Sequence, residues 1–238
     1  MAPLLPLPAG RIDVWLTPLA AVGADEQRRY AGLLNPAEDA AWRRFKVAGA
    51  ALQHLVARAL VRTTLSRYAA VPPLAWEFAR NAHGRPHVAA PAEGCDLLFN
   101  LSHTDGLVAL AIGRGCEFGV DVEHMPRRVE AADLAPRFFA PAEAAHVLAA
   151  SGAELRDRFF AFWTLKEAYI KARGMGLALP LDSFWYDLDG PRIHFTDRCP
   201  DDPRRWHFFR TDPTAEHRLA LAVAAPKPPE IRLQEVVP

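Results

Sequence analysis

Apolar residues recur along this chain with two different periods, and each period predicts one kind of secondary structure. Short runs rich in aliphatic side chains, at residues 12–16, 97–101 and 107–112, predict strands. Residues 50–68 instead carry apolar side chains at helical spacing, and these are Leu52, Leu55, Val56, Ala59, Leu60 and Leu65. The first half of the chain should therefore contain several strands and a long amphipathic helix.

The second half shows the same mixture of periods. Helical spacing returns near residues 131–139 and 153–173, and the remainder is rich in strands. Residues 183–188 and 192–195 flank an Asp-Gly dipeptide, which is a strong signal for a β-hairpin. We therefore expect an α+β fold.

One weak internal repeat is present. Residues 107–112 and residues 219–223 are similar strands, and each follows a helix and several shorter strands. Two α+β halves would produce this pattern. Ala, Leu and Val recur in every protein, however, so periodicity alone leaves duplication and coincidence equally open.

Composition and charge narrow the class of protein. At 238 residues, the chain is long enough to bury a full core as one large domain or two small ones. Lys plus Arg and Asp plus Glu number 28 each, so no overall electric field indicates nucleic acid or an anionic membrane as a partner. Any anion-binding site must therefore be local.

Cysteine usage and the N-terminus favour an enzyme of the cytoplasm. No Cys-x-x-Cys pair is present, so the sequence indicates neither a disulfide framework nor a zinc site. The first residues include prolines but no basic segment, unlike a secretory signal peptide. No apolar run reaches the length of a membrane span.

Two short acidic segments carry the candidate chemistry, and the first is at residues 118–123. As a strand, it places Val120 and Val122 on one face, which should be buried, and Asp121 and Glu123 together on the other. Taken alone, such a pair of carboxylates more often marks the exposed face of an edge strand.

The second segment lies in the predicted helix at residues 153–173, where Trp163, Glu167 and Lys171 follow one side at intervals of four. Alone, Glu167 and Lys171 would be an exposed ion pair. Aromatic residues cover several sides of this helix, however, so it should be packed into the protein, where an unpaired carboxylate is costly. If this side faces the strand, three carboxylates and a lysine converge. Such a set suits Mg²⁺ and a reaction on a phosphate ester or anhydride.

Two polar loops could also meet a phosphate. Ser102 and His103 lie between two predicted strands, where they either bind backbone groups or offer a hydroxyl and an imidazole to an anion. Arg85 follows Gly84 in a turn, and its guanidinium is suited to a bidentate phosphate contact. Without further context, this segment would be an ordinary turn.

Taken in order, four segments resemble the signatures of the 4′-phosphopantetheinyl transferase superfamily, in its Sfp-like class of double-domain enzymes. They are residues 84–86 (Gly-Arg-Pro), 100–103 (Asn-Leu-Ser-His), 119–123 (Gly-Val-Asp-Val-Glu) and 163–171 (Trp-Thr-Leu-Lys-Glu-Ala-Tyr-Ile-Lys). The resemblance extends in colinear order over residues 42–187. The two acidic signatures together with the Ser-His loop make it specific.

This resemblance implies two similar α+β halves related by a pseudo-twofold axis, with mostly antiparallel sheets and packed helices. Residues 1–114 would lie on the coenzyme A nucleotide side, and residues 115–238 would carry the metal-binding and catalytic residues. The active site would be in the cleft between them. Because the chain supplies both halves itself, a monomer is expected.

The resemblance also implies a reaction. Enzymes of this family move the 4′-phosphopantetheine arm of coenzyme A to a serine of an apo acyl or peptidyl carrier protein and release 3′,5′-ADP, with Mg²⁺. By position in the motifs, the metal ligands would be Asp121, Glu123 and Glu167. Glu167 would also deprotonate the carrier serine, directly or through a water. The coenzyme A contacts would be Arg85, Ser102, His103, Lys166 and Lys171, and Lys171 would also act in catalysis.

One stretch departs from the family pattern. Sfp-like proteins usually carry an Arg or His a few residues before the helix predicted at residues 50–68, where it contacts the 3′-phosphate of coenzyme A. Residues 46–52 contain neither. The replacement contact could come from Arg44, Lys46, Gln53 or His54. A relaxed preference between coenzyme A and dephospho-coenzyme A would follow.

Two other functions use the same residues. A metal-dependent hydrolase of coenzyme A or a related nucleotide would use water as its nucleophile. A non-catalytic carrier-binding protein would need only a docking surface, for which Arg127, Arg128 and Arg137 are candidates beside an acidic carrier helix. The sequence does not distinguish polyketide, nonribosomal peptide, fatty acid and siderophore synthesis as the pathway served.

Overall fold

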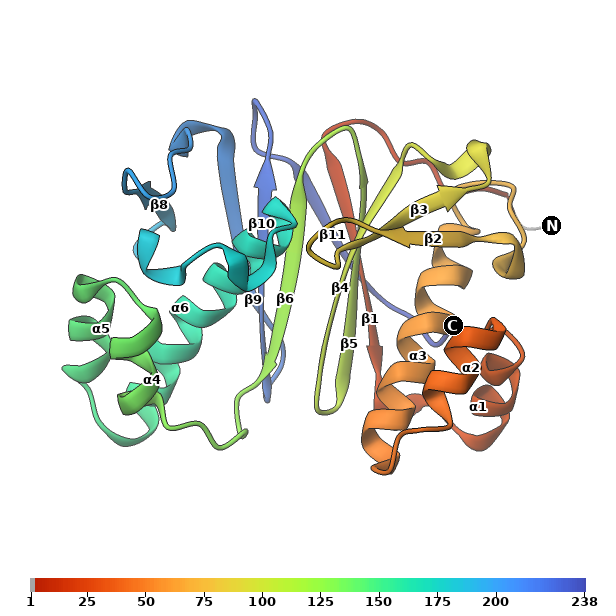
Figure 1. The fold of residues 1–238 in the computed structure, drawn as a ribbon, viewed down its shortest axis with the longest axis horizontal. Helices are drawn as coiled ribbons and strands as arrows, with labels where there is room; N and C mark the ends of the chain where they lie inside the picture. The colour runs from red at the N-terminus through yellow and green to blue at the C-terminus, as the bar shows by residue number, and fades with distance from the viewer. Residues whose placement is uncertain (1–2) are drawn as a thin grey trace. The chain divides into compact units, whose positions relative to one another are not determined.

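Strands and helices follow one another as the apolar pattern predicts, as the computed structural model of residues 3–238 shows (Figure 1). The chain folds into two compact units. Unit 1 comprises the residues up to Asn81 together with Pro86–Gly115 and Glu230–Pro238, and unit 2 comprises Ala82–Arg85 and Cys116–Pro229.

Unit 1 is built on a four-stranded sheet with the order β11-β1-β5-β4. These strands are β1 (Arg11–Pro18), β4 (Leu97–Thr104), β5 (Leu107–Arg114) and β11 (Glu230–Glu235). β11 runs parallel to β1, and the other neighbouring pairs are antiparallel. Because β5 is an inner strand and α3 (Ala48–Leu65) packs against it, β5 is buried along almost its whole length.

The long helix predicted at residues 50–68 is α3. Its apolar side joins the core of unit 1. Shorter helices α1 (Ala24–Ala31) and α2 (Pro36–Trp42) precede it, and β2 (Glu77–Arg80) pairs with β3 (Pro86–Ala90) in a separate two-stranded sheet. The C-terminal strand β11 returns to the sheet of unit 1, which the apolar pattern did not indicate.

Unit 2 is built on a three-stranded antiparallel sheet with the order β6-β10-β9. These strands are β6 (Phe118–His124), β9 (Trp206–Thr214) and β10 (His217–Ala224). The long helix α6 (Gly152–Arg173) lies across β6 and β10 (Figure 1). Two short helices, α4 (Ala131–Phe138) and α5 (Pro141–Leu148), connect β6 to α6 and pack against each other.

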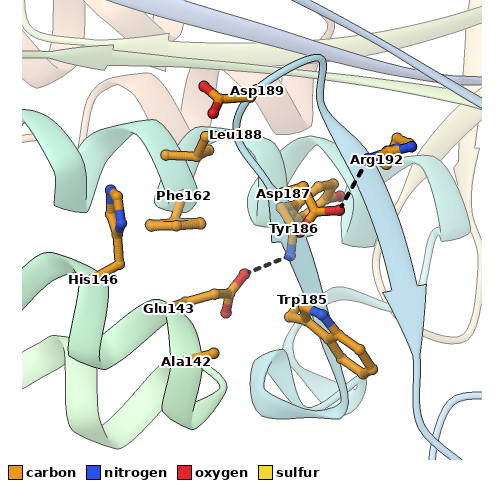
Figure 2. Close-up of a pocket in the computed structure, with 10 residues that line it drawn as sticks. All are labelled: Ala142, Glu143, His146, Phe162, Trp185, Tyr186, Asp187, Leu188, Asp189 and Arg192. Carbon is orange, nitrogen blue, oxygen red and sulfur yellow. Dashed lines mark hydrogen bonds and ion pairs between the residues drawn. The ribbon is translucent and has the colours of Figure 1, made fainter.

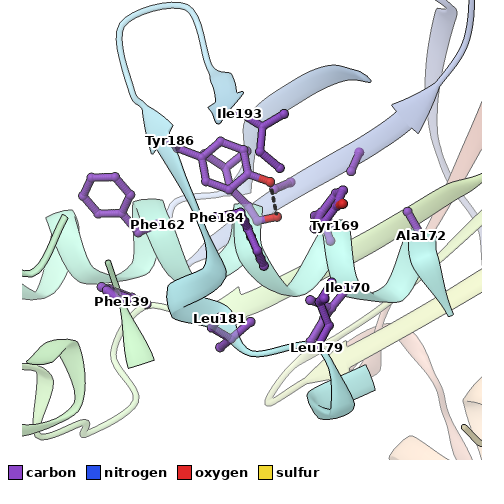
Figure 3. Packing of buried hydrophobic residues seen from close by; sticks show 14 of the residues in the cluster. Phe139, Phe162, Tyr169, Ile170, Ala172, Leu179, Leu181, Phe184, Tyr186 and Ile193 are labelled. Carbon is purple, nitrogen blue, oxygen red and sulfur yellow. Dashed lines mark hydrogen bonds between the residues drawn. The ribbon is translucent and has the colours of Figure 1, made fainter. Parts of the chain in front are cut away.

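A β-hairpin completes unit 2. It consists of β7 (Phe184–Asp187) and β8 (Arg192–Phe195), and its turn contains the predicted Asp-Gly dipeptide. A cavity of about 650 Å³ lies between this hairpin and α5, with Phe162 of α6 in its lining (Figure 2). Phe184 and Tyr186 of the hairpin belong to the same buried cluster as Tyr169 and Ile170 of α6, and the Phe184 ring contacts that of Tyr169 (Figure 3).

The predicted α+β fold with mostly antiparallel sheets is confirmed. Each unit combines a long helix packed on a sheet with a separate two-stranded hairpin or ribbon. The pseudo-twofold axis and the functional division at residue 114 stay predictions. Among residues 3–238, no helix is long and apolar enough to cross a membrane.

The packing of α6 on β6 depends on Gly119. A Cβ atom at this position would collide with the carbonyl oxygen of Ala168 and the backbone nitrogen of Ala172, and would lie 2.9 Å from the carbonyl carbon of Lys171. All three are backbone atoms of α6, which a rotamer change cannot move aside. Glycine therefore allows the helix backbone to rest directly on the strand.

We expect Gly119→Ala to lower the free energy of unfolding by about 2 kcal/mol or more, because helix and strand must separate to admit the methyl group. Urea denaturation followed by circular dichroism would measure this. Gly49→Ala in α3 is the matched control, since a Cβ there has no neighbour within 4 Å and its stability should be unchanged or slightly higher. Equal stability of Gly119→Ala and the native chain would contradict the contact.

Candidate active site

β6 presents Asp121 and Glu123 to α6. Because side chains alternate along a strand, these two carboxylates share the face of Gly119, on which the helix rests. Both are buried, with 3% and 7% of their surface exposed. The interpretation of Asp121 and Glu123 as solvent-exposed charges on an edge strand is therefore wrong. β6 is an edge strand of its sheet, but α6 covers the face that carries the two carboxylates.

α6 supplies the partners of these carboxylates. Nζ of Lys171 lies 2.6 Å from Oδ1 of Asp121, and Nε1 of Trp163 donates a hydrogen bond of 2.9 Å to Oε1 of Glu123. From the loop after β6, the guanidinium of Arg127 lies 3.2 Å from Oε2 of Glu123. The predicted side of α6 therefore does face the strand.

Glu167 completes the group. Its pKa is raised to about 7, chiefly by burial and then by the charge of Asp121; Glu123 adds to the rise, and Lys171 opposes it. Burial and the charge of Asp121 also raise the pKa of Glu123, against the opposite effect of Arg127. The three carboxylates thus repel one another electrostatically, and the nearby cations do not remove that repulsion. Such a group favours an added cation.

The donor set fits Mg²⁺ in type. Asp121, Glu123 and Glu167 offer carboxylate oxygens, which this ion prefers. Within residues 3–238, no three His, Cys, Asp or Glu side chains are grouped closely enough to form a metal cage by themselves. Mg²⁺ commonly uses one or two carboxylates and completes its coordination with waters and substrate phosphates, so a partial set from the protein is consistent with it.

Lys166 does not fit the predicted contact with coenzyme A phosphates. Its side chain is fully buried, and Nζ lies 2.7 Å from each of three acceptors: Oε2 of Glu143 and the carbonyl oxygens of Leu181 and Phe184. An ammonium group has three donors, so none is left for a phosphate. Helical spacing could have indicated this, because Lys166 shares a side of α6 with Phe159, Phe162 and Tyr169, and that side is the core.

Arg85 is anchored within unit 2. Its guanidinium donates hydrogen bonds of 2.6 Å to the carbonyl oxygen of Ala172 and 3.1 Å to that of Phe118. The first of these carbonyls lies in the last turn of α6, where backbone acceptors have no partner within the helix. Arg85 therefore ties the end of α6 to the start of β6, and its predicted contact with coenzyme A stays a prediction.

The predicted loop at Ser102 and His103 is wrong: both residues lie at the end of β4, paired with β5 in unit 1. Ser102 is buried and His103 is exposed. Within the same unit, α3 approaches the turn that follows: Nε2 of Gln53 donates a hydrogen bond of 2.9 Å to the carbonyl oxygen of Thr104. His54 is close enough to His103 for the two charges to interact, and burial lowers the pKa of His54.

The other candidates for the 3′-phosphate contact lie before α3. Arg44 and Lys46 are both exposed, in the segment between α2 and α3. Gln53 and His54 are thus the two of the four candidates that the structure places beside the Ser-His segment.

Sequence reasoning did not identify Trp163 and Arg127 as partners of Glu123. The spacing of Trp163 from Glu167 indicated its helix face, but not its strand partner. Arg127 is four residues after Glu123, a spacing at which side chains meet on a helix. Glu123 lies in β6 and Arg127 in the loop after it, so this spacing did not indicate their contact.

The raised pKa of Glu167 predicts how stability depends on pH. This carboxylate titrates near 4.5 in the unfolded chain and at about 7 in the folded one, so the folded state binds its proton more tightly. Its contribution to stability is fully present below pH 4.5 and is lost as the pH rises through 7. In metal-free protein, Glu167→Gln should therefore increase the free energy of unfolding by about 2 kcal/mol at pH 8 and by less than about 1 kcal/mol at pH 5.

Urea denaturation at the two pH values measures this difference. Glu154→Gln, at an exposed position of the same helix, is the control and should show no such pH dependence. An equal effect of Glu167→Gln at both pH values would show that this carboxylate is not perturbed.

Comparison with known proteins identifies the family. Residues 117–224 match the family described as the 4′-phosphopantetheinyl transferase superfamily, and residues 24–114 match 4′-phosphopantetheinyl transferase, N-terminal. A 4′-phosphopantetheinyl transferase of Bacillus subtilis is 30% identical over 93% of this chain and 89% of its own length. 4′-Phosphopantetheinyl transferase HetI of a Nostoc species is 31% identical over 74% of each chain.

4′-Phosphopantetheinyl transferase Sfp of Bacillus subtilis is 29% identical over 87% of this chain and 89% of its own length. Among solved structures, holo-[acyl-carrier-protein] synthase of Thermotoga maritima matches 48% of this chain and 66% of its own with 20% identity and a TM-score of 0.37, too weak a match for a detailed comparison. The chain therefore belongs to the 4′-phosphopantetheinyl transferase superfamily, in its Sfp-like, double-domain class.

Proposed function

We propose that the protein transfers the 4′-phosphopantetheine arm of coenzyme A to a serine hydroxyl of an apo acyl or peptidyl carrier protein, with Mg²⁺, and releases 3′,5′-ADP. The observation that carries this proposal is the group formed by Asp121, Glu123, Glu167 and Lys171 between β6 and α6. Membership of the transferase superfamily supports it. In this proposal the protein acts as a monomer in the cytoplasm.

Glu167 is the proposed base. Its pKa of about 7 suits a group that must accept a proton from the carrier serine near neutral pH, directly or through a water. Asp121 and Glu123 would supply the other carboxylate oxygens that bind the metal. Together the three carboxylates would hold Mg²⁺, which supplies charge neutralisation at the pyrophosphate of coenzyme A.

Lys171 is the proposed phosphate contact on α6. About a quarter of its side chain is exposed, in contrast to the buried Lys166 next to Glu167. Its ammonium lies 2.6 Å from Oδ1 of Asp121, and because the side chain is in part exposed it would also contact a phosphate oxygen. A cation there would reduce the repulsion between the phosphate and the attacking oxygen.

Unit 1 is proposed to bind the nucleotide part of coenzyme A through Ser102 and His103. In place of the Arg or His of related enzymes, Gln53 and His54 would meet the 3′-phosphate. Gln53 is a neutral donor, and burial lowers the pKa of His54, so neither supplies a fixed positive charge.

The carrier-docking surface is proposed to include Arg128 and Arg137, whose side chains are exposed. Arg127 is also exposed, but it is already paired with Glu123, so it is the weaker candidate of the three.

Transfer can be measured directly. Purified protein, coenzyme A, Mg²⁺ and an apo carrier protein should give a carrier heavier by one phosphopantetheine arm in mass spectrometry. Glu167→Gln should lower the rate by about 10²- to 10⁴-fold because the base is lost, and chelation of Mg²⁺ should stop transfer. Glu154→Gln is the matched control on the same helix and should transfer at the native rate.

Two results would reject this proposal. Metal-dependent release of phosphopantetheine without labelling of any carrier, across several carrier classes, would indicate a hydrolase. Binding of a carrier without binding of Mg²⁺ and coenzyme A would indicate a non-catalytic protein. Rates compared among the carrier classes would also indicate the pathway served.

The 3′-phosphate contact has its own test. A neutral hydrogen bond contributes about 0.5–1.5 kcal/mol and a charged one about 1.5–3 kcal/mol. We therefore expect kcat/KM for coenzyme A to exceed that for dephospho-coenzyme A by less than about tenfold. Gln53→Arg should increase this ratio. A preference above about a hundredfold in the native protein would show that a cation already binds this phosphate.

A further inference from the structure

Lys166 and Glu143 form an ion pair inside the core of unit 2. The two side chains are 0% and 1% exposed. The ammonium of Lys166 lies 4.4 Å from the centre of the Phe184 ring and 5.6 Å from that of Phe139. Aromatic faces, one carboxylate and two carbonyl oxygens thus surround the charge, and water does not reach it.

Glu143 connects three elements through its two oxygens. Oε1 accepts a hydrogen bond of 2.9 Å from the backbone nitrogen of Tyr186, in β7, as Figure 2 shows. Oε2 accepts one of 3.0 Å from the nitrogen of Ala140, which caps α5, and also binds Lys166. α5, the hairpin and α6 therefore meet at one carboxylate.

Polar bonds add to the apolar packing at this junction. The cavity of about 650 Å³ beside Glu143 separates α5 from part of the hairpin (Figure 2). The bonds of Lys166 to Leu181 and Phe184 add a second link, from α6 to the segment leading into β7. Polar bonds with fixed geometry and apolar packing thus act together to hold α6 to these elements.

A buried pair of this kind is expected to add little net stability. The free energy needed to remove two charges from water is about as large as the attraction between them. Apolar residues of the same size can therefore often replace such pairs without loss of stability. What a buried pair does supply is one defined arrangement, because an unpaired buried charge is strongly disfavoured. For α6 this means one rotation about its axis and one position along it.

That rotation determines where Glu167 lies. Lys166 and Glu167 are adjacent, so their side chains leave the helix about 100° apart. With Nζ of Lys166 held at three acceptors, Glu167 is directed toward Asp121 and Glu123. On the strand side, Gly119 sets the distance between α6 and β6, but a glycine contact does not prevent the helix from turning.

We propose that the Lys166–Glu143 pair is a positioning pair for the transfer reaction: it fixes the rotation of α6 and so holds Glu167 against the carboxylates of β6. This inference rests on the proposed function. Lys166 and Glu143 act through Glu167, and neither touches the substrate.

Three variants test it: Lys166→Met, Glu143→Gln and the two together, in the full chain. Each should lower kcat about tenfold to a hundredfold, because a small displacement of a reacting group has an effect of this size. KM for coenzyme A and its dissociation constant by calorimetry should stay within about twofold of the native values. The effects should not add in the double variant, because the residues act as one pair.

Lys166→Met leaves a buried carboxylate without its cation and can fail to fold, so Glu143→Gln and the double variant carry the test. In the double variant both charges are gone, so the melting temperature should recover relative to Lys166→Met while kcat stays low. Val147→Ala, a buried substitution in α5 that leaves the pair intact, is the control. It should lower the melting temperature without changing kcat at 20 °C.

Two outcomes would overturn the proposal. A double variant with native kcat would show that the pair only stabilises the core. A tenfold rise in KM for coenzyme A in Lys166→Met, with Glu143→Gln unaffected, would make Lys166 a phosphate contact. Failure of the native chain to transfer the arm would instead reject the proposed function, so the two failures are distinguishable.

Discussion

The candidate site depends on one close contact between backbones. At Gly119, α6 rests on β6 with no side chain between them, and this distance lets helix side chains reach strand carboxylates. Lys171 meets Asp121, and Trp163 meets Glu123, within hydrogen-bonding distance. The Gly-x-Asp-x-Glu pattern is therefore one face of one strand: the glycine admits the helix, and the two acids meet it. Arg85 adds a tie at the end of the same contact.

Although positive and negative side chains balance over the whole chain, this contact brings several negative charges close together. Three carboxylates are brought together in a largely buried place, and burial together with mutual repulsion raises the pKa values of Glu123 and Glu167. That arrangement costs stability in the folded protein and is relieved by a proton or a cation. In the core on another side of α6, the buried Lys166 has all three of its donors satisfied, so no such repulsion arises there.

Much of this could be predicted from sequence because it follows from periodicity. The hairpin at the Asp-Gly turn, the long helices α3 and α6, and the shared face of Trp163, Glu167 and Lys171 all follow from local spacing. The rest depends on tertiary contacts that spacing does not encode. The partners of Lys166 (Glu143, Leu181 and Phe184) come from other segments of the chain, and β11 joins a strand more than 200 residues away in sequence. Arg127 reaches Glu123 through a loop, beyond the range of any periodic rule.

We propose that α6 and β6 together form a divalent metal site that serves coenzyme A. Crystals grown with coenzyme A and Mn²⁺, a substitute for Mg²⁺ that scatters anomalously, would locate the ion. We expect one anomalous peak at bonding distance from carboxylate oxygens of Asp121, Glu123 and Glu167, with a phosphate oxygen of coenzyme A on the same ion. A peak elsewhere, or coenzyme A bound with its pyrophosphate away from these three residues, would show that the metal site does not lie between α6 and β6.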